Sequence, residues 1–304
     1  MENLVDLFCW EEHRKILTCR ESGIPALQTF GICSNNRAGQ PLHVHTHNGC
    51  MEIVFVVKGI QVYEAGGEVY NLTGSDIFVS YTGEPHSSGS YPENVCDLIW
   101  MQIRMEKGIP FFGLDESHAV YLRESLLALP RFFSGDAALR SMLTEAFFGL
   151  AEKSEMDRYM AEQKLVYCLF RIVQLSQKMI PRRTDCIEDA IAFIHANLGN
   201  PILLEEAADS CGLSLSRFKV KFKEEIGVTP REYINRVKIE KSKRLLEENC
   251  SVTDTALNLG FSTPNYFAVS FKKYTGLTPR EYQERIRESD AERKEQSCQK
   301  AQKN

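Results

Sequence analysis

The sequence contains no apolar run long enough to cross a membrane. Every stretch of about 18 residues, the shortest length that suggests a spanning helix, is interrupted by charged side chains. The N-terminal segment is acidic, with Glu2, Asp6, Glu11 and Glu12 in its first turns, whereas a secretory signal peptide begins with basic residues. We therefore expect a cytoplasmic protein that does not use a membrane as partner.

The ten cysteines of the chain form no C-x-x-C pair. This absence argues against a zinc ribbon and against a dithiol redox motif, and in the cytoplasm such scattered thiols stay reduced. The length of 304 residues is sufficient for two domains that each bury a core.

The chain as a whole has no net positive charge: its net charge is −5, which by itself argues against a nucleic-acid partner. The charge is unevenly distributed, however. Residues 211–287 contain 15 Lys and Arg against 9 Asp and Glu, whereas residues 1–210 contain 17 against 28. This segregation favours a nucleic-acid partner for the C-terminal third only.

The same third holds an internal repeat. Two copies of a Gly-x-Thr-Pro-Arg-Glu-Tyr sequence, at 227–233 and 276–282, lie 49 residues apart. Each copy follows a helical segment, a glycine stop and a second helix with two phenylalanines four residues apart, and its proline opens a further helix. Two helix-turn-helix units in series predict a protein that binds two adjacent major-groove segments of double-stranded DNA.

The second helix of each unit has a valine opposite its core face. At about 100° per residue, Val220 points away from the direction set by Phe218 and Phe222, and Val269 has the same relation to its own phenylalanines. An exposed valine suits the methyl group of thymine; alternatively, a neighbouring domain covers it, or it is simply tolerated at the surface. The predicted base contacts are Ser216, Lys219, Val220, Lys223, Pro264, Asn265, Tyr266 and Val269, and the predicted phosphate contacts are Arg217, Arg236, Lys238, Lys272, Lys273 and Arg280.

These features resemble the AraC/XylS family of bacterial transcription regulators. The resemblance is dense over residues 186–287 and rests on the paired Phe-x-Val-x-Phe helices and their repeated closures. It implies an all-α tandem helix-turn-helix domain in which a long helix, here 231–248, joins the two units. It also implies transcription activation, with RNA polymerase as a partner. Members of the family often carry Arg where this chain has Val220 and Val269, so a guanine contact is not transferred to these positions.

A second pattern lies in the N-terminal half. The residues Gly39, His45, His47, Glu52 and Gly59 are spaced as G-x5-H-x-H-x4-E-x6-G, and a second element ends at His86. Short β-rich runs surround them, including a hairpin predicted over 62–69 around a Gly-Gly pair. The pattern resembles the cupin fold over about residues 25–107 and implies a small antiparallel β-barrel of the jelly-roll type. The expected fold class is therefore α+β, with helices flanking this barrel.

In cupin enzymes, the positions of His45, His47, Glu52 and His86 hold a divalent metal, and three imidazoles with one carboxylate suit Zn, Fe, Mn or Ni. Two interpretations stay open: a metal site, or a pocket in which the same four residues bind a small polar effector. Further candidates for effector binding, or else ordinary core residues, are Tyr63, Tyr81 and Trp100.

The function that we predict is a sequence-specific transcription regulator, an activator that responds to a sugar or related metabolite in the barrel. No catalytic residue is assigned. The alternatives are a metal-sensing regulator and a metal-dependent cupin enzyme fused to a DNA-binding domain. A bound metal and turnover would favour the enzyme, whereas a barrel filled with side chains would favour a purely structural domain.

The domain boundaries follow from composition. We expect a sensor barrel over 1–115, a helical region over 116–180, a linker over 181–185, the DNA-binding domain over 186–287 and a disordered tail over 288–304. Apolar residues recur at helical spacing over 117–129, 137–153 and 156–178. These helices are the candidate contact of a homodimer.

Overall fold

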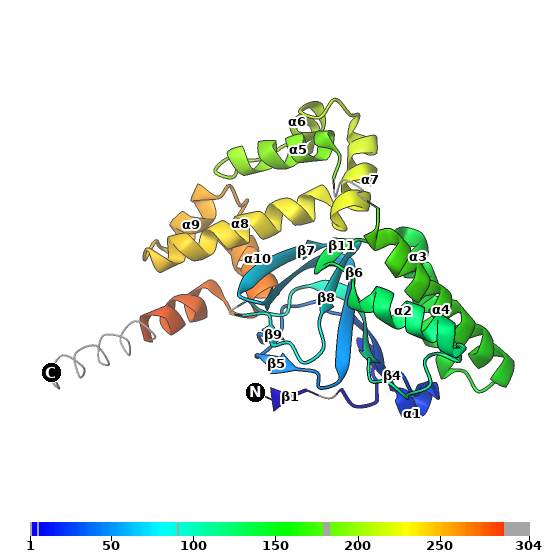
Figure 1. The fold of residues 1–304 in the computed structure, drawn as a ribbon. Helices are drawn as coiled ribbons and strands as arrows, with labels where there is room; N and C mark the ends of the chain where they lie inside the picture. Colours follow the sequence, from blue (N-terminus) through cyan, green and yellow to red (C-terminus); the bar gives the residue numbers. More distant parts are fainter. Residues whose placement is uncertain (1, 5, 90, 179–182, 289–304) are drawn as a thin grey trace, which may run out of the picture. The chain divides into compact units, whose positions relative to one another are not determined.

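The computed structural model describes residues 2–4, 6–89, 91–178 and 183–288 (Figure 1). For most of the chain, the division into two compact units falls between Thr184 and Asp185. Part of the predicted linker, residues 181–182, and the predicted tail from residue 289 lie outside the described residues. Among the described residues, no helix combines the length and apolar character that a membrane crossing needs.

The first unit is built on a sheet that curls around the long strand β6 (Cys50–Ala65). The first part of β6 pairs with β10 (Cys96–Arg104) and β8 (Asp76–Ser80), and its second part with β7 (Glu68–Thr73) and β9 (His86–Ser87). Beyond β10 the sheet continues through β4 (Leu27–Ser34), β3 (Arg14–Thr18) and β2 (Cys9–Trp10), while β11 (Phe132–Ser134) pairs with β8. All these pairs are antiparallel, as predicted. A parallel pair joins β1 (Glu2–Asn3) to β5 (His45–Thr46).

The predicted hairpin is the β6–β7 connection. Ala65 pairs with Glu68 across the turn, and the two residues between them, Gly66 and Gly67, have φ of 60° and 82°. Two central residues with positive φ are the requirement of a type I′ turn, whose twist matches that of the flanking strands. The Gly-Gly pair therefore fixes the register in which β7 pairs with β6.

Successive side chains along each strand point to opposite faces of the sheet, so the apolar ones form two separate layers. On β6, Val54 and Val56 belong to the cluster on the inner face of the curled sheet, together with Phe78 and Trp100. Ile53 belongs to the cluster on the outer face. Three helices cover this outer face: α2 (Glu116–Leu127), α3 (Ala137–Ala151) and α4 (Glu155–Ser176).

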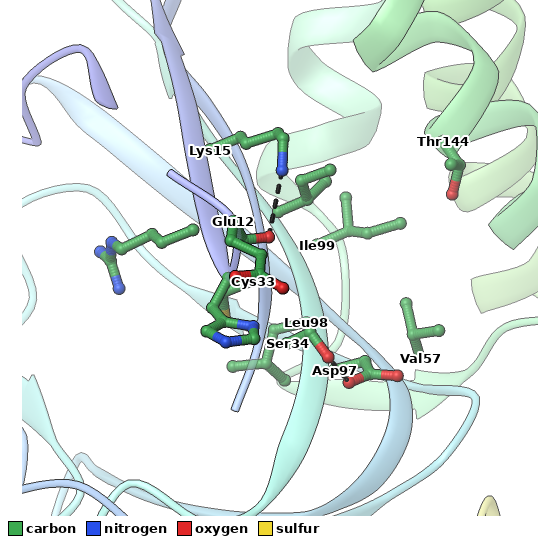
Figure 2. A pocket seen from close by; sticks show the side chains of 12 residues that line it. Glu12, Lys15, Cys33, Ser34, Val57, Asp97, Leu98, Ile99 and Thr144 are labelled. Atoms are coloured by element: carbon green, nitrogen blue, oxygen red, sulfur yellow. Dashed lines mark hydrogen bonds between the residues drawn. The ribbon is translucent and has the colours of Figure 1, made fainter. Parts of the chain in front are cut away.

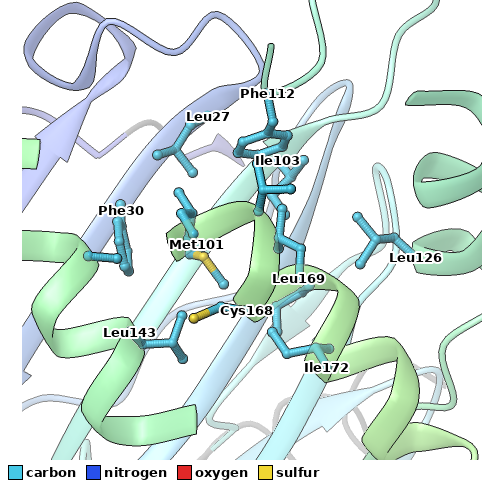
Figure 3. Packing of buried hydrophobic residues seen from close by; sticks show 14 of the residues in the cluster. Leu27, Phe30, Met101, Ile103, Phe112, Leu126, Leu143, Cys168, Leu169 and Ile172 are labelled. Carbon is cyan, nitrogen blue, oxygen red and sulfur yellow. The ribbon is translucent and has the colours of Figure 1, made fainter. Parts of the chain in front are cut away.

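The packing of these helices explains why the sequence predicted them. Leu143 of α3 and Leu169 of α4 are fully buried and face Phe30 and Met101 of the sheet (Figure 3). Each helix begins after a side chain that accepts backbone N–H groups: Asp115, Asp136 and Ser154. The predicted helices are confirmed to within two residues at each end. The short helix α1 (Cys19–Ser22) precedes β4.

Gly31 of β4 makes room for a tryptophan on the inner face. It is paired with Trp100 of β10, and a Cβ atom at Gly31 would lie 2.2 Å from Trp100 Cζ2. We expect Gly31→Ala to lower the free energy of unfolding of the first unit by about 1–3 kcal/mol, because the ring must shift. Denaturant unfolding of the full chain measures it. In a Trp100→Phe background, which lacks the crowded ring atoms, the cost should fall; equal costs would contradict this explanation.

The second unit consists of short helices around a long one. α6 (Leu204–Asp209) and α7 (Leu215–Ile226) form the first helix-turn-helix, and α9 (Val252–Asn258) and α10 (Pro264–Thr275) form the second. The long helix α8 (Pro230–Glu247) joins them, and α5 (Asp185–Ala196) precedes them. Residues 279–288 are also helical. The predicted connecting helix, 231–248, matches α8 within one residue at each end.

The two copies of the repeated sequence make the same contacts in the structure. Phe218, Phe222, Phe267 and Phe271 are all fully buried. The tyrosine that ends each Gly-x-Thr-Pro-Arg-Glu-Tyr closure packs edge-on against the second phenylalanine, with centroids 5.4 Å apart for both Phe222–Tyr233 and Phe271–Tyr282. The glycine stops after α6 and α9, Gly212 and Gly260, have φ of 66° and 61°. The two motifs therefore close two equivalent small cores.

Candidate functional site

The outer faces of α7 and α10 are open to solvent. Val220 is 58% exposed and Val269 is 61% exposed, while the phenylalanines two residues on either side are buried. The helices of the second unit thus leave both valines uncovered, as a contact with a base requires. The other predicted base-contact residues are also exposed or partly exposed: Ser216, Lys219, Lys223, Pro264, Asn265 and Tyr266.

The predicted phosphate contacts divide into two groups. Arg217, Lys272, Lys273 and Arg280 are exposed, so their charges are available to a polyanion. Arg236 and Lys238 are only 7% and 4% exposed, and for these two the prediction is wrong. α8 packs against α9 and α10, and Arg236 and Lys238 lie on its buried faces.

Arg236 and Lys238 have other partners. The guanidinium of Arg236 pairs with Glu232, at 3.2 Å between Nη2 and Oε1, and lies 5.1 Å from the ring centroid of Tyr274. The ammonium of Lys238 donates to the backbone carbonyls of Asn200 and Gly260. Both side chains therefore stabilise the second unit from within.

A groove of about 740 Å³ lies between the two helix-turn-helix units. Its lining includes Lys219 of α7 and Tyr266 of α10, together with Arg231 and Asn235 of α8. Asn235 Nδ2 donates to Tyr266 Oη at 2.9 Å, which links α8 to α10. Arg231 and Asn235 were not predicted from the sequence, although their i, i+4 spacing places them on one face of a helix.

The four residues of the cupin pattern converge inside the curled sheet. His45 of β5 and His86 of β9 are paired across adjacent strands, and one ring nitrogen from each of His45, His47 and His86 lies within 4.8 Å of the others. Glu52 of β6 lies beside them, with Oε1 3.3 Å from His47 Nε2 and Oε2 3.3 Å from His86 Nε2. All four side chains are buried.

Backbone carbonyls orient the three imidazoles. The Nδ1 atoms of His45, His47 and His86 lie 2.8, 2.9 and 3.1 Å from the carbonyl oxygens of His43, Leu4 and Glu84. A carbonyl only accepts, so each Nδ1 carries a hydrogen, and in the neutral ring each Nε2 is left with a lone pair. Among the described residues, His86 Nε2 has no hydrogen-bond partner of good geometry.

Burial and pairing shift the pKa values of this cluster in opposite directions. Burial opposes the ionisation of Glu52, but its pairing with His47 and the charge of the neighbouring His86 ring outweigh it and lower the pKa of Glu52. Burial lowers the pKa of His45. Burial also acts to lower the pKa of His47, yet the hydrogen bond and charge of Glu52 raise it overall. A protonated His47 paired with an ionised Glu52 is the arrangement that these shifts favour.

Two polar residues that were not predicted from the sequence extend the cluster. Gln102 Nε2 donates to Glu52 Oε1 and to Asp6 Oδ2, each at 3.2 Å, and Trp100 Nε1 donates to Asp6 Oδ2 at 2.9 Å. Gln102 lies two residues after Trp100 on β10, so both side chains point to the inner face. This spacing is visible in the sequence. Asp6 lies far before the cupin pattern, and nothing in the sequence around it indicated that it reaches these residues.

The predicted aromatic residues lie in two different places. Trp100 is on the inner face, and Tyr63 stacks there on Phe78 with centroids 4.7 Å apart. Tyr81 is on the outer, helix-covered face: its hydroxyl donates to the Leu129 carbonyl at 3.0 Å. Effector contact by Tyr81 is therefore wrong, because this residue has the parity of the outward-facing side chains of β8.

A separate cleft of about 210 Å³ lies elsewhere on the first unit (Figure 2). Its lining includes Lys15, Cys33, Asp97 and Thr144 and none of the four cupin-pattern residues. Lys15 Nζ donates to the Glu12 carbonyl and Ser34 Oγ donates to Asp97, so these polar groups are already paired. The cleft therefore has less to offer a polar ligand than the histidine cluster.

Comparison with known proteins finds a family model for each of the two parts of the chain. A helix-turn-helix domain model matches residues 207–285, and a model of the AraC-like ligand binding domain matches residues 35–109. The chain belongs to the AraC family of transcription regulators. Its relatives include the HTH-type transcriptional activator RhaR of Shigella dysenteriae serotype 1 (strain Sd197), 24% identical over 229 residues that cover 73% of this chain and 80% of the relative. RhaR of Escherichia coli O139:H28 (strain E24377A / ETEC) gives the same figures.

Two solved structures give weaker likenesses. ToxT from Vibrio cholerae O395 covers 90% of this chain and 100% of its own, at 14% identity and a TM-score of 0.32. The DNA-binding domain of AdpA covers 35% of this chain and 96% of its own, at 23% identity and a TM-score of 0.34. At these TM-scores, neither supports a statement about this chain.

The AraC-family regulator is a DNA-binding protein and not an enzyme, so the alternative of a cupin enzyme is set aside.

Proposed function

We propose that this AraC-family regulator activates transcription by placing α7 and α10 in two adjacent major-groove segments. The observation that carries the proposal is the matched pair of exposed faces centred on Val220 and Val269, each above a buried pair of phenylalanines. Activation is supported by the relatives, which are named transcriptional activators. An activator acts on RNA polymerase in the cytoplasm, which is the partner and the location that we assign.

Gel-shift measurements with the full-length chain test the proposal. Promoter fragments from a genome-wide map of bound DNA are the probes, and affinity is measured over a salt series. We expect binding to weaken steeply with salt, because phosphate neutralisation releases counterions. Lys273→Ala should weaken binding to all sequences alike and reduce the slope by about 1. A folded chain that binds no fragment at low salt would contradict the proposal.

The effector that we propose is a small polar molecule seated on His45, His47, Glu52 and His86. The adjacent carboxylate of Asp6 and the amide of Gln102 add acceptors and a donor to the same wall. A sugar or related metabolite suits such a wall, since each hydroxyl both donates and accepts hydrogen bonds. Trp100 and Tyr63 supply apolar surface beside these groups.

A divalent metal is the second candidate for the same site. The orientation of the three rings favours it, because each Nδ1 faces a backbone carbonyl and the opposite nitrogen is turned toward the other rings, an arrangement typical of metal-binding histidines. His45, His47, His86 and Glu52 would hold the ion, and the buried Nε2 of His86 would gain a partner. A bound ion would supply positive charge beside Glu52 and make the protein a metal-responsive regulator.

We further propose a homodimer through α4. This helix exposes several large apolar side chains to solvent: Met156, Tyr159, Met160 and Tyr167. A set of this kind along one helix is more consistent with a protein partner than with a solvated surface. Sedimentation equilibrium of the full chain measures the association, and a monomer at micromolar concentration would contradict it.

A further inference from the structure

Lys238 lies in the middle of α8, the helix that joins the two helix-turn-helix units, yet it is buried. Its Nζ atom donates to the carbonyl of Asn200 at 3.3 Å and to the carbonyl of Gly260 at 3.4 Å. The ring of Phe261 lies beside the ammonium, 5.8 Å from its centroid. Asn200 precedes the first helix-turn-helix, and Gly260 is the turn of the second. One side chain therefore donates hydrogen bonds to the backbone beside the first helix-turn-helix and to the backbone of the second.

Both carbonyls lie just after the C-terminal end of a helix. Asn200 follows α5, and its N–H donates to the Asn197 carbonyl in the closing turn. Gly260 follows α9, and its N–H donates to the Leu257 carbonyl. The C-terminal end of a helix carries partial negative charge, so a cation is stabilised there. The ammonium of Lys238 bonds both carbonyls and lies close to the end of α9, which offsets the cost of removing it from water.

The two backbones approach closely at this point. A Cβ atom at Gly260 would lie 3.0 Å from the carbonyl carbon of Asn200 and 3.2 Å from Lys238 Nζ. A Cβ atom at Gly199 would lie 3.7 Å from the Asn258 carbonyl oxygen. The loop after α5 and the turn after α9 thus form one junction, with the ammonium of Lys238 at its centre.

We propose that Lys238 is a positioning residue that sets the separation at which the two recognition helices meet DNA. The inference rests on the proposed function, in which α7 and α10 occupy adjacent major-groove segments. Such segments lie about 34–36 Å apart along the duplex, or roughly 10 base pairs. A cation bonded to both halves holds them at one orientation, so that only one spacing of the two half-sites satisfies both helices.

The test is selection from a pool of random-sequence DNA duplexes, in which the protein itself picks out its operator sequence. The full-length wild-type chain should recover two sequence blocks at one fixed separation. Lys238→Met keeps the length of the side chain but removes the cation. It should recover either variable separations or a single block, and should bind the wild-type two-block duplex at least tenfold more weakly. Lys238→Arg keeps a cation and donors, and should restore the fixed separation.

Arg244→Met is the matched control. Arg244 is exposed on α8, so its loss changes the net charge equally without touching the junction, and the wild-type separation should be recovered. Gly260→Ala perturbs the junction independently, because its Cβ would crowd Asn200 and Lys238; it too should relax the separation. If circular dichroism shows that Lys238→Met does not fold, the block separation recovered by Gly260→Ala tests the proposal in its place.

The outcomes separate the two proposals. A folded wild-type chain that recovers no two-block sequence would overturn the proposed function. A wild-type chain that recovers two blocks at one separation, together with Lys238→Met that recovers the same blocks at the same separation, would overturn only the role of Lys238. The same holds if Gly260→Ala, standing in for an unfolded Lys238→Met, keeps the wild-type separation.

Discussion

Glutamate at Val220 or at Val269 is expected to reduce sequence-specific DNA binding at least a hundredfold, about 3 kcal/mol, and to leave the fold unchanged. Both valines are more than half exposed, so the replacement buries no charge in the free protein and removes no core contact. In the proposed complex each residue faces a base edge in a groove lined by phosphates, where a carboxylate is repelled. The double variant should bind no better than an unrelated protein of the same charge.

The control is Leu257→Glu. Leu257 is 61% exposed on α9 of the same unit, so this variant adds the same charge at an equally exposed position without entering a recognition helix. Gel shifts on the mapped promoter fragments measure all the variants, and circular dichroism checks their folding. Equal losses for Leu257→Glu and Val269→Glu would mean that added negative charge, rather than the position on α10, weakens binding.

Truncation of the same valines to alanine tests whether each one sets the preference for a particular base pair. Val220→Ala and Val269→Ala should each relax the preference at one base pair, a thymine, by about 1 kcal/mol, because only the contact with the C5-methyl group is lost. Binding measured against a panel of single-base variants of the promoter site shows the position. An effect that is equal for every sequence would remove base readout by these residues.

The residues that the sequence located correctly are those governed by periodicity. The pairs Phe218–Phe222 and Phe267–Phe271 had to face a core because they lie one helical turn apart beside a glycine stop, and the structure buries all four. The cupin pattern similarly indicated that its histidines converge, and the structure pairs His45 of β5 with His86 of β9.

The failures have a common cause, which is that a pattern gives the face of an element but not what covers that face. Arg236 and Lys238 were assigned to phosphates from charge alone, yet α8 has protein on the faces where they lie. Tyr81 was assigned to the pocket from residue type alone, although it directly follows β8 and continues the alternation of Ile77 and Val79, which face the helices. Asp6 was missed because its position depends on the pairing of β1 with β5, a contact between distant segments.

In the barrel, the double variant His47→Ala/Glu52→Ala is expected to abolish stabilisation of the protein by its effector. A ligand at about a hundred times its dissociation constant stabilises the folded state by about 2.7 kcal/mol, and this increment should vanish, since the variant removes the carboxylate and the imidazole that pair with each other. Thermal unfolding with a library of sugars and with divalent metals measures it. His43→Ala is the matched control, because the exposed ring of His43 is removed while the backbone carbonyl that orients His45 remains.

Elemental analysis of protein purified without an affinity tag separates the two ligands. Stoichiometric metal that is lost in the double variant would support the metal site, whereas metal-free protein stabilised by a sugar would support the polar pocket. Either ligand should change DNA affinity by about 1–3 kcal/mol, and DNA should change the affinity for that ligand equally. Absence of any stabilisation by both classes of ligand would leave the barrel a structural domain.

The dependence on pH distinguishes the ligands further. Because the pKa of His47 is raised in the folded chain, its protonated pair with Glu52 stabilises the ligand-free protein below the unfolded-state pKa of about 6.5. That contribution is lost as the pH rises through the higher folded-state pKa. A metal must displace this proton, so metal affinity should fall as the pH drops below the same range. A sugar can accept a hydrogen bond from the protonated ring, so its affinity should not show this loss.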